Sequence, residues 1–184
     1  MKTVVFTVIA FMIVGSLFSQ NLPSFNLQTR FGVQSDLPNG ESVFGGGLGG
    51  VLRFASIDNP WQIGLYVDKF SNDELSELNY HGYKRWSAMI SVGKMWKTGW
   101  RIAKKQLRIG GGVLLISTLH LRAAPGGDYA TVSAPSFGVY TRINYPLIEF
   151  GNSEVLLFTD HSLFGEGFMR NLLGISYPLG KKLN

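Results

Sequence analysis

Asp160, His161 and Ser162 are the one place in the sequence where an acid, an imidazole and a hydroxyl fall together. These groups are the components of a nucleophilic hydrolase site, in which the imidazole takes the hydroxyl proton and the acid orients the imidazole. If the segment is a β-strand, neighbouring side chains point to opposite faces. Asp160 and Ser162 can then share a face that His161 does not reach. This geometry favours an ordinary polar strand end over a catalytic triad.

Arginines on the polar side of several segments are a second group of residues that could form a functional site. The candidate binding residues are Arg30, Arg53, Asp68, Arg85, Arg108 and Arg142. An excess of arginine on one face could bind an anion or a small acidic solute. The simpler expectation is that these arginines pair with acids, and Asp160, Glu149 and Glu154 could supply them.

Other common kinds of site have little support in the sequence. The 184 residues include no cysteine, which excludes thiolate metal ligands, a cysteine nucleophile and a lipid-modified cysteine. The histidines are dispersed, with His81 and His120 isolated, so we predict no metal site and no cofactor. The run Gly45–Gly50 is followed by neither a Lys-Ser/Thr pair nor a helix, which argues against a phosphate loop. Basic residues are scattered despite a net charge of +5, which argues against nucleic-acid binding.

The segments that would position these residues alternate with a period of two. In Ser24–Gln34, every second residue from Phe25 to Val33 is apolar or threonine, and the residues between are polar or glycine. This period indicates a β-strand with one apolar face. Seven further segments are read as strands: Val43–Ser56, Trp61–Asp68, Arg85–Trp96, Arg108–His120, Ser136–Tyr145, Glu154–Phe164 and Phe168–Leu179. We therefore predict an all-β chain of eight strands.

The connections between the predicted strands roughly alternate between long and short. The longer polar loops are Ser35–Ser42, Ser71–Gly82 and Ala123–Thr131. Ile57–Asn59 and Pro146–Ser153 are the short links, and Lys97–Gln106 is an exception because it is long and basic. Such alternation is typical of a meander whose two ends face different environments.

The two faces of the predicted strands indicate where the chain resides. One face carries glycine, serine, asparagine, glutamine, tyrosine and a few arginines, which suits the crowded interior of a narrow barrel. The other face carries large apolar residues, which suits lipid. Aromatic residues that form interfacial girdles stand near predicted strand ends, at Trp61, Trp86, Trp96, Trp100, Tyr145 and Tyr177. We predict a single eight-stranded antiparallel up-and-down transmembrane β-barrel.

The amino terminus has the features of a secretory signal. Lys2 precedes the apolar run Val4–Val14, and small residues lead to a cleavage point after Ser19. The run is short for a membrane-spanning helix, so an uncleaved anchor is the less favoured alternative. We predict that residues 1–19 are a cleaved signal peptide and that residues 20–184 form the barrel domain.

With these features the sequence resembles the small eight-stranded outer-membrane β-barrels of Gram-negative bacteria, which are OmpX-like in size. The resemblance covers the mature chain and depends on pattern rather than on a motif. Such barrels usually end on an aromatic residue, whereas here Tyr177 is followed by a further seven residues. The resemblance implies location in the outer membrane, contact with outer-membrane lipid, and a non-enzymatic structural or surface-interaction role.

Two alternatives remain open at this stage. Outer-membrane lipid A deacylases are barrels of this size, and similarity to them would make His161, Ser162 and Glu166 the catalytic residues. Their His-x-Ser spacing is absent here, because His161 and Ser162 are adjacent. The second alternative is a secreted, lipocalin-like barrel that binds an apolar ligand in its interior.

For the favoured function, the long connections supply the contacts with a partner protein or glycan. The residues expected to make these contacts are Asp73, Glu74, Glu77, Tyr80 and Tyr83. The segment Lys94–Lys105 interleaves cations with tryptophans and could contact anionic lipid headgroups, although a solvated turn with lysines that extend from the membrane interface explains the same pattern.

Overall fold

The computed structural model of the chain describes residues 24–38, 40–54, 59–72, 83–124, 127–150, 153–165 and 167–179. Its strands are β1 (Ser24–Asp36), β2 (Glu41–Phe54), β3 (Trp61–Asn72), β4 (Tyr83–Ile102), β5 (Lys105–Ala124), β6 (Gly127–Val132), β7 (Ser136–Phe150), β8 (Ser153–Phe164) and β9 (Phe168–Leu179). The predicted signal peptide, residues 1–19, lies outside the described residues. In the described part of the chain, no helix is long and apolar enough to span a membrane.

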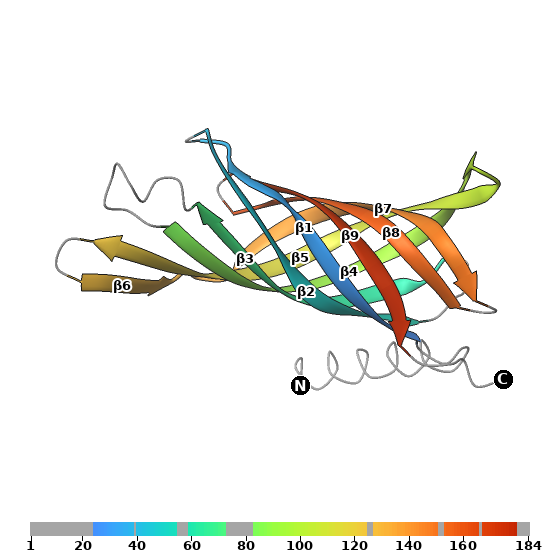
Figure 1. Cartoon of the computed structure of the whole chain (residues 1–184), viewed down its shortest axis with the longest axis horizontal. Coiled ribbons are helices and arrows are strands. Elements are labelled where there is room, and N and C mark those ends of the chain that lie inside the picture. Colours follow the sequence, from blue (N-terminus) through green and yellow to red (C-terminus); the bar gives the residue numbers. More distant parts are fainter. Residues whose placement is uncertain are drawn as a thin grey trace, which may run out of the picture.

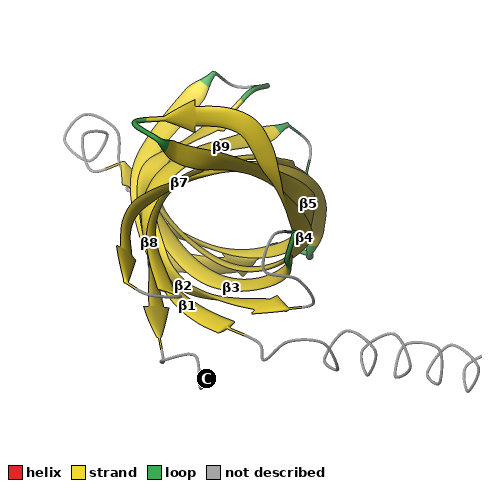
Figure 2. Cartoon of the chain, turned by 90° about the vertical axis from the view of Figure 1, so that its right-hand side faces the viewer, coloured by secondary structure: helices red, strands yellow, loops and turns green. Residues whose placement is uncertain are grey.

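The strands form a closed antiparallel barrel in which sequence neighbours are also sheet neighbours, except for β6 and β7 (Figure 1). β1 pairs with both β2 and β9, and β4 pairs with both β3 and β5, so the described sheet closes into a ring that is seen end-on in Figure 2. β6 and β7 both pair with β5 and are separated by Ser133–Pro135, so together they take the place of one strand. The prediction of an eight-stranded up-and-down barrel is confirmed.

The barrel has two distinct ends. β1 begins and β9 finishes at one end, which we call the terminal end, and the β1–β2 and β8–β9 turns lie at the other, which we call the loop end. The two turns at the loop end are in contact, since the Leu37 backbone N–H donates to the Gly167 carbonyl at 3.0 Å. In Figure 1 the terminal end lies to the right and the loop end to the left.

Three predicted connections are strand rather than loop. Lys97–Gln106 belongs to the long β4–β5 hairpin, in which Ile102 and Lys105 pair across a two-residue turn. Ala123–Thr131 is largely β5 and β6, and Pro146–Ser153 contains the end of β7. These predictions were wrong because the connections were placed where the alternation ends, whereas backbone pairing extends all three hairpins beyond the alternating segments.

The interior and exterior of the barrel have the polarity that the alternation predicted. Along β1, Asn26, Gln28, Arg30 and Gln34 are buried, while the residues between them are exposed or partly exposed. The exposed large apolar residues come from every strand of the closed ring. Phe54 departs from this alternation: its position in β2 has the same parity as that of the exposed Phe44, and yet it is buried. The interior also holds an apolar cluster that includes Val51, Met89, Leu114 and Ile116. The fold therefore has a mixed interior, in which polar side chains lie beside this cluster, and an apolar outer belt.

Candidate functional site: the barrel interior and a groove on its outer face

Asp68 is the centre of the first ion-pair cluster in the interior. Arg30 donates to both of its carboxylate oxygens, from Nε to Oδ1 at 2.8 Å and from Nη2 to Oδ2 at 2.6 Å. Arg170 donates to Oδ2 at 2.7 Å, and its other nitrogen reaches the Gln34 amide oxygen at 2.6 Å. Asp68 is 0% exposed and Arg170 is 1% exposed. This cluster joins β1, β3 and β9 across the interior.

Asp160 is the centre of a second cluster, next to the first. Arg142 donates to both oxygens of Asp160 through Nε and Nη2. The Nη2 of Arg142 also donates to the Tyr66 hydroxyl at 2.9 Å, and the Arg30 guanidinium lies over the Tyr66 ring at 3.7 Å. Arg30 Nη1 is 3.6 Å from Asp160 Oδ2, which links the two clusters. The Tyr66 ring is thus held between arginines of β1 and β7.

The remaining predicted arginines differ in their surroundings. Arg108 forms a two-point ion pair with Glu154, in which Nη2 donates to Oε1 at 2.7 Å. The Arg85 guanidinium lies 4.6 Å from the centre of the Phe168 ring. Arg53 makes no ion pair with any residue that the structure describes, and its Nε and Nη2 are buried without a hydrogen-bond acceptor there. Pairing with acids therefore accounts for Arg30, Arg108 and Arg142 but not for Arg53.

Arg170 is the important interior residue that sequence reasoning missed. The alternation in Phe168–Leu179 is blurred, so its faces were not assigned. The signal was nevertheless present, because Arg170 and Ser176 have the same parity and both are buried. An arginine on the same face as small polar residues of a barrel strand is expected inside.

The space left in this part of the interior is small. The cavity lined by Arg30, Tyr66, Arg142, Asp160 and Arg170 has a volume of about 10 Å³. This is room for roughly one water molecule. In the described chain, the two clusters therefore fill the centre of the barrel rather than surround a solute, which leaves no space there for an apolar ligand of lipocalin type.

The candidate hydrolase residues are not brought together. His161 is exposed on the outer face of β8, where its Nδ1 lies 2.7 Å from the Asn171 side-chain oxygen. Ser162 is buried in the interior, and Asp160 is held by Arg142. Glu166 lies outside the described residues. β8 thus places the imidazole and the hydroxyl on opposite sides of the barrel wall, as the period of two requires.

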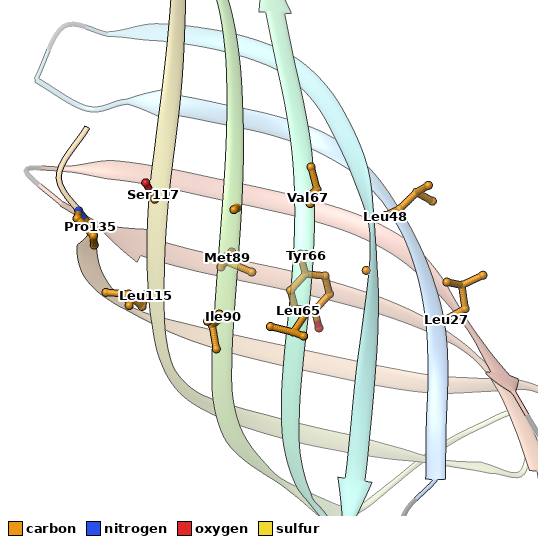
Figure 3. Close-up of a pocket in the computed structure, with 12 residues that line it drawn as sticks. Leu27, Leu48, Leu65, Tyr66, Val67, Met89, Ile90, Leu115, Ser117 and Pro135 are labelled. Atoms are coloured by element: carbon orange, nitrogen blue, oxygen red, sulfur yellow. The ribbon is translucent and has the colours of Figure 1, made fainter. Parts of the chain in front are cut away.

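A groove of about 610 Å³ runs over the outer face of the barrel, across β1 to β5 (Figure 3). Its walls are large apolar side chains from these strands, Leu27, Leu48, Leu65, Ile90 and Leu115. The groove forms where the outward-facing residues between them are small, at Ala88 and Ser117. A side chain at Gly49 has no room, because a Cβ there would lie 2.1 Å from Tyr66 Cδ1.

Lysines and tryptophans are paired on the outer face near both ends of the barrel. Lys94 lies over the Trp61 ring at 5.6 Å near the terminal end, and Lys69 lies over the Trp86 ring at 5.6 Å on the other side of the belt. Trp100 is exposed on the β4–β5 hairpin. These pairs have the composition of the interfacial girdles that border a lipid-facing belt.

Most of the predicted partner contacts lie outside the described residues, namely Asp73, Glu74, Glu77 and Tyr80, as does His81. Tyr83 is the first residue of β4 and pairs with Arg122 of β5, which places it at the loop end. His120 pairs with Arg85 in the same ladder. Among the described residues, no group of three or more His, Asp or Glu side chains could hold a metal ion.

Comparison with known proteins supports the fold and does not identify a family. No family model and no curated protein matches the chain. The solved structure of Neisserial surface protein A is similar, with a TM-score of 0.53 and 12% identity over 84% of this chain and 96% of that one. Ail of Yersinia pestis, solved with the heparin analogue sucrose octasulfate, has a TM-score of 0.58 and 9% identity over 85% and 97%. A major outer membrane protein from Thermus thermophilus has a TM-score of 0.54 and 12% identity over 86% and 100%.

The ion pairs in the interior and the apolar outer belt define a β-barrel of the membrane-spanning class. Within that class, the chain has the fold of the small eight-stranded outer-membrane barrels, as the pattern of its sequence implied.

Proposed function

We propose that the protein is an integral outer-membrane barrel without enzymatic activity, and that it acts structurally or through its surface connections. The observation that carries this proposal is that large apolar side chains are exposed on the outside of the barrel, whereas charged side chains are buried inside it. Leu48 on the outside is 60% exposed, while Asp68 inside is 0% exposed. In water such a surface would be an association hazard, whereas in a bilayer it is the favourable arrangement.

Outer-membrane lipid is the first proposed partner. The groove across β1 to β5 has apolar walls and lies within the exposed belt, so an acyl chain is the occupant that its chemistry favours. The lysine–tryptophan pairs at Trp61 and Trp86 would lie at the two interfaces, with the terminal end toward the periplasm.

A protein or glycan that meets the loop end is the second proposed partner. The connection 71–82 carries Asp73, Glu74 and Glu77 and neither lysine nor arginine. A cationic partner therefore complements it better than a sulfated glycan of the kind to which Ail was bound in its crystal. Substitution of Tyr80 or of the acidic residues in this connection is proposed to weaken binding of the cationic partner.

Electrophoretic mobility of the folded protein tests the membrane assignment. The chain without residues 1–19 is folded in detergent micelles and run with and without boiling, alongside its circular-dichroism spectrum. A mobility shift that appears only on boiling, together with a β-type spectrum, is the expected result. A monomer that stays in solution without detergent and shows no shift would contradict the proposal.

A further inference from the structure

Arg53 is half-buried, and it differs from the buried arginines in which atoms of its guanidinium lack a partner. Arg30 holds Asp68 through Nε and Nη2, and Arg142 holds Asp160 through the same two atoms. In Arg53 these two atoms are buried and have no hydrogen-bond acceptor among the described residues. This edge of the guanidinium is the one that binds the two oxygens of a carboxylate side by side.

A second unsatisfied donor lies directly beside this edge. Gln62 of β3 is the residue opposite Arg53 of β2, and both lie on the inward face of their strands. Residues in such a pair have Cβ atoms about 4.5–5.5 Å apart. Gln62 is buried, and its Nε2 also has no acceptor within the described ranges. The adjacent side chains of Arg53 and Gln62 thus both carry hydrogen-bond donors for which the described residues supply no acceptor.

The acids of the described interior are already engaged. Asp68 binds Arg30 and Arg170, Asp160 binds Arg142, and Glu154 binds Arg108. None of these contacts involves Arg53. Glu154 acts on Arg53 electrostatically, but its carboxylate oxygens are held by Arg108, so the two arginines share one acid. A water molecule could accept hydrogen bonds from Arg53, but it would leave this excess of positive charge in place, and charge without compensation is unfavourable away from bulk water.

We propose that Arg53 and Gln62 form a binding site for a small oxyanion that presents two oxygens side by side, as a simple carboxylate does. The Nε and Nη2 of Arg53 each donate to one oxygen, and the Gln62 amide donates to one of them. The site lies near the terminal end, because Arg53 pairs with Ser24 at the start of β1. It is distinct from the groove and from the surface connections, and so it does not depend on either proposed partner.

A nuclear magnetic resonance titration of the folded barrel tests this site directly. Protein labelled with [15N]arginine is folded in micelles, and the Arg53 Nε–H signal is assigned by its loss in Arg53→Gln. Sodium formate and sodium chloride are added at equal ionic strength. We expect a saturable shift with formate, and a response at least ~10-fold weaker with chloride, because a single atom does not bridge two nitrogens in this way.

Variants separate the proposed site from general effects of salt. Gln62→Met retains Arg53 and removes one charge-assisted hydrogen bond, so the affinity for formate should fall about 10-fold. Lys94→Gln, which changes a cation on the outer face, should leave it unchanged. The Arg30 and Arg142 signals should not move, because both side chains already hold carboxylates.

Two results would overturn the proposal. One is an Arg53 signal that does not saturate with formate, or that responds equally in Gln62→Met. The other is a change of the Arg53 signal in Asp58→Asn without formate, which would show that an acid of the chain itself is the partner.

Discussion

Arg170 and Asp68 lie 102 positions apart in the sequence and are joined by a 2.7 Å hydrogen bond at the centre of the barrel. Arg30 holds the other side of the same carboxylate, so one acid fixes the first, third and last strands relative to one another. The pair is fully enclosed, and each partner depends on the other for its charge compensation. Removal of either partner should therefore cost more than loss of a surface ion pair.

Asp68→Asn should strongly destabilise the barrel. It leaves Arg30 and Arg170 without their shared carboxylate, and breaking a buried pair of this kind costs about 3–5 kcal/mol. The free energy of unfolding in guanidinium chloride, followed by tryptophan fluorescence in micelles, measures the effect. Glu149→Gln, which changes an exposed carboxylate on β7, is the control and should shift it by less than about 0.5 kcal/mol. Equal effects of the two substitutions would mean that the cluster does not hold the strands together.

A charge in the outer belt distinguishes a membrane barrel from a water-soluble one. Leu48→Arg should reduce the free energy of unfolding by about 2–4 kcal/mol in lipid vesicles if the residue lies near the middle of the bilayer. Leu37→Arg, in the exposed turn after β1, should have little effect. In a soluble barrel both positions would tolerate arginine, so indistinguishable variants would contradict the lipid-facing assignment.

Packing behind the groove makes Gly49 intolerant of a side chain. The Cβ of Gly49→Ala would lie 2.1 Å from Tyr66 Cδ1 and 2.5 Å from the Leu65 carbonyl oxygen. Overpacking of this kind costs about 1–3 kcal/mol. Gly99→Ala is a matched control, because nothing lies within 4 Å of the added atom. The same chemical denaturation experiment compares the two, and a stable Gly49→Ala barrel would show that Tyr66 is free to move.

Ser162→Ala tests the hydrolase alternative. With Ser162 inside the barrel and His161 outside, neither residue can activate the other, so we expect no contribution to lipid A chemistry. Mass spectrometry of lipid A from cells that express the wild-type protein, Ser162→Ala or no copy should give the same acylation pattern. Loss of an acyl chain with the wild-type protein alone would restore the enzymatic interpretation.

The faces of the strands were predictable because a period of two assigns each residue to one side. This is why Arg30, Arg108 and Arg142 could be placed in the interior from the sequence alone. The contacts across the barrel could not be predicted in this way. The contact between Asp68 and Arg170 depends on how the sheet closes, and the alternation within one strand carries no information about residues on the opposite wall.

The tight β4–β5 turn was missed for a different reason. Ala103 and Lys104 have φ angles of 49° and 68°, the left-handed conformation that a two-residue hairpin turn of type I′ requires at both positions. Sequences signal such turns mainly through Asn-Gly and similar pairs, and neither residue is of that kind. The residue types at 103 and 104 therefore do not predict the left-handed backbone, and the pairing along the long hairpin stabilises it.

The pairing of the first strand with the last, in which Phe25 is opposite Leu179, has a consequence for biogenesis. Until β9 has been synthesised, β1 has an edge without a partner, and so does whichever strand is last in the growing sheet. Contacts this distant in sequence form slowly, because a long loop must close before they contribute. The barrel therefore closes only after translation, and the edges of β1 and β9 must be protected from other chains until they meet.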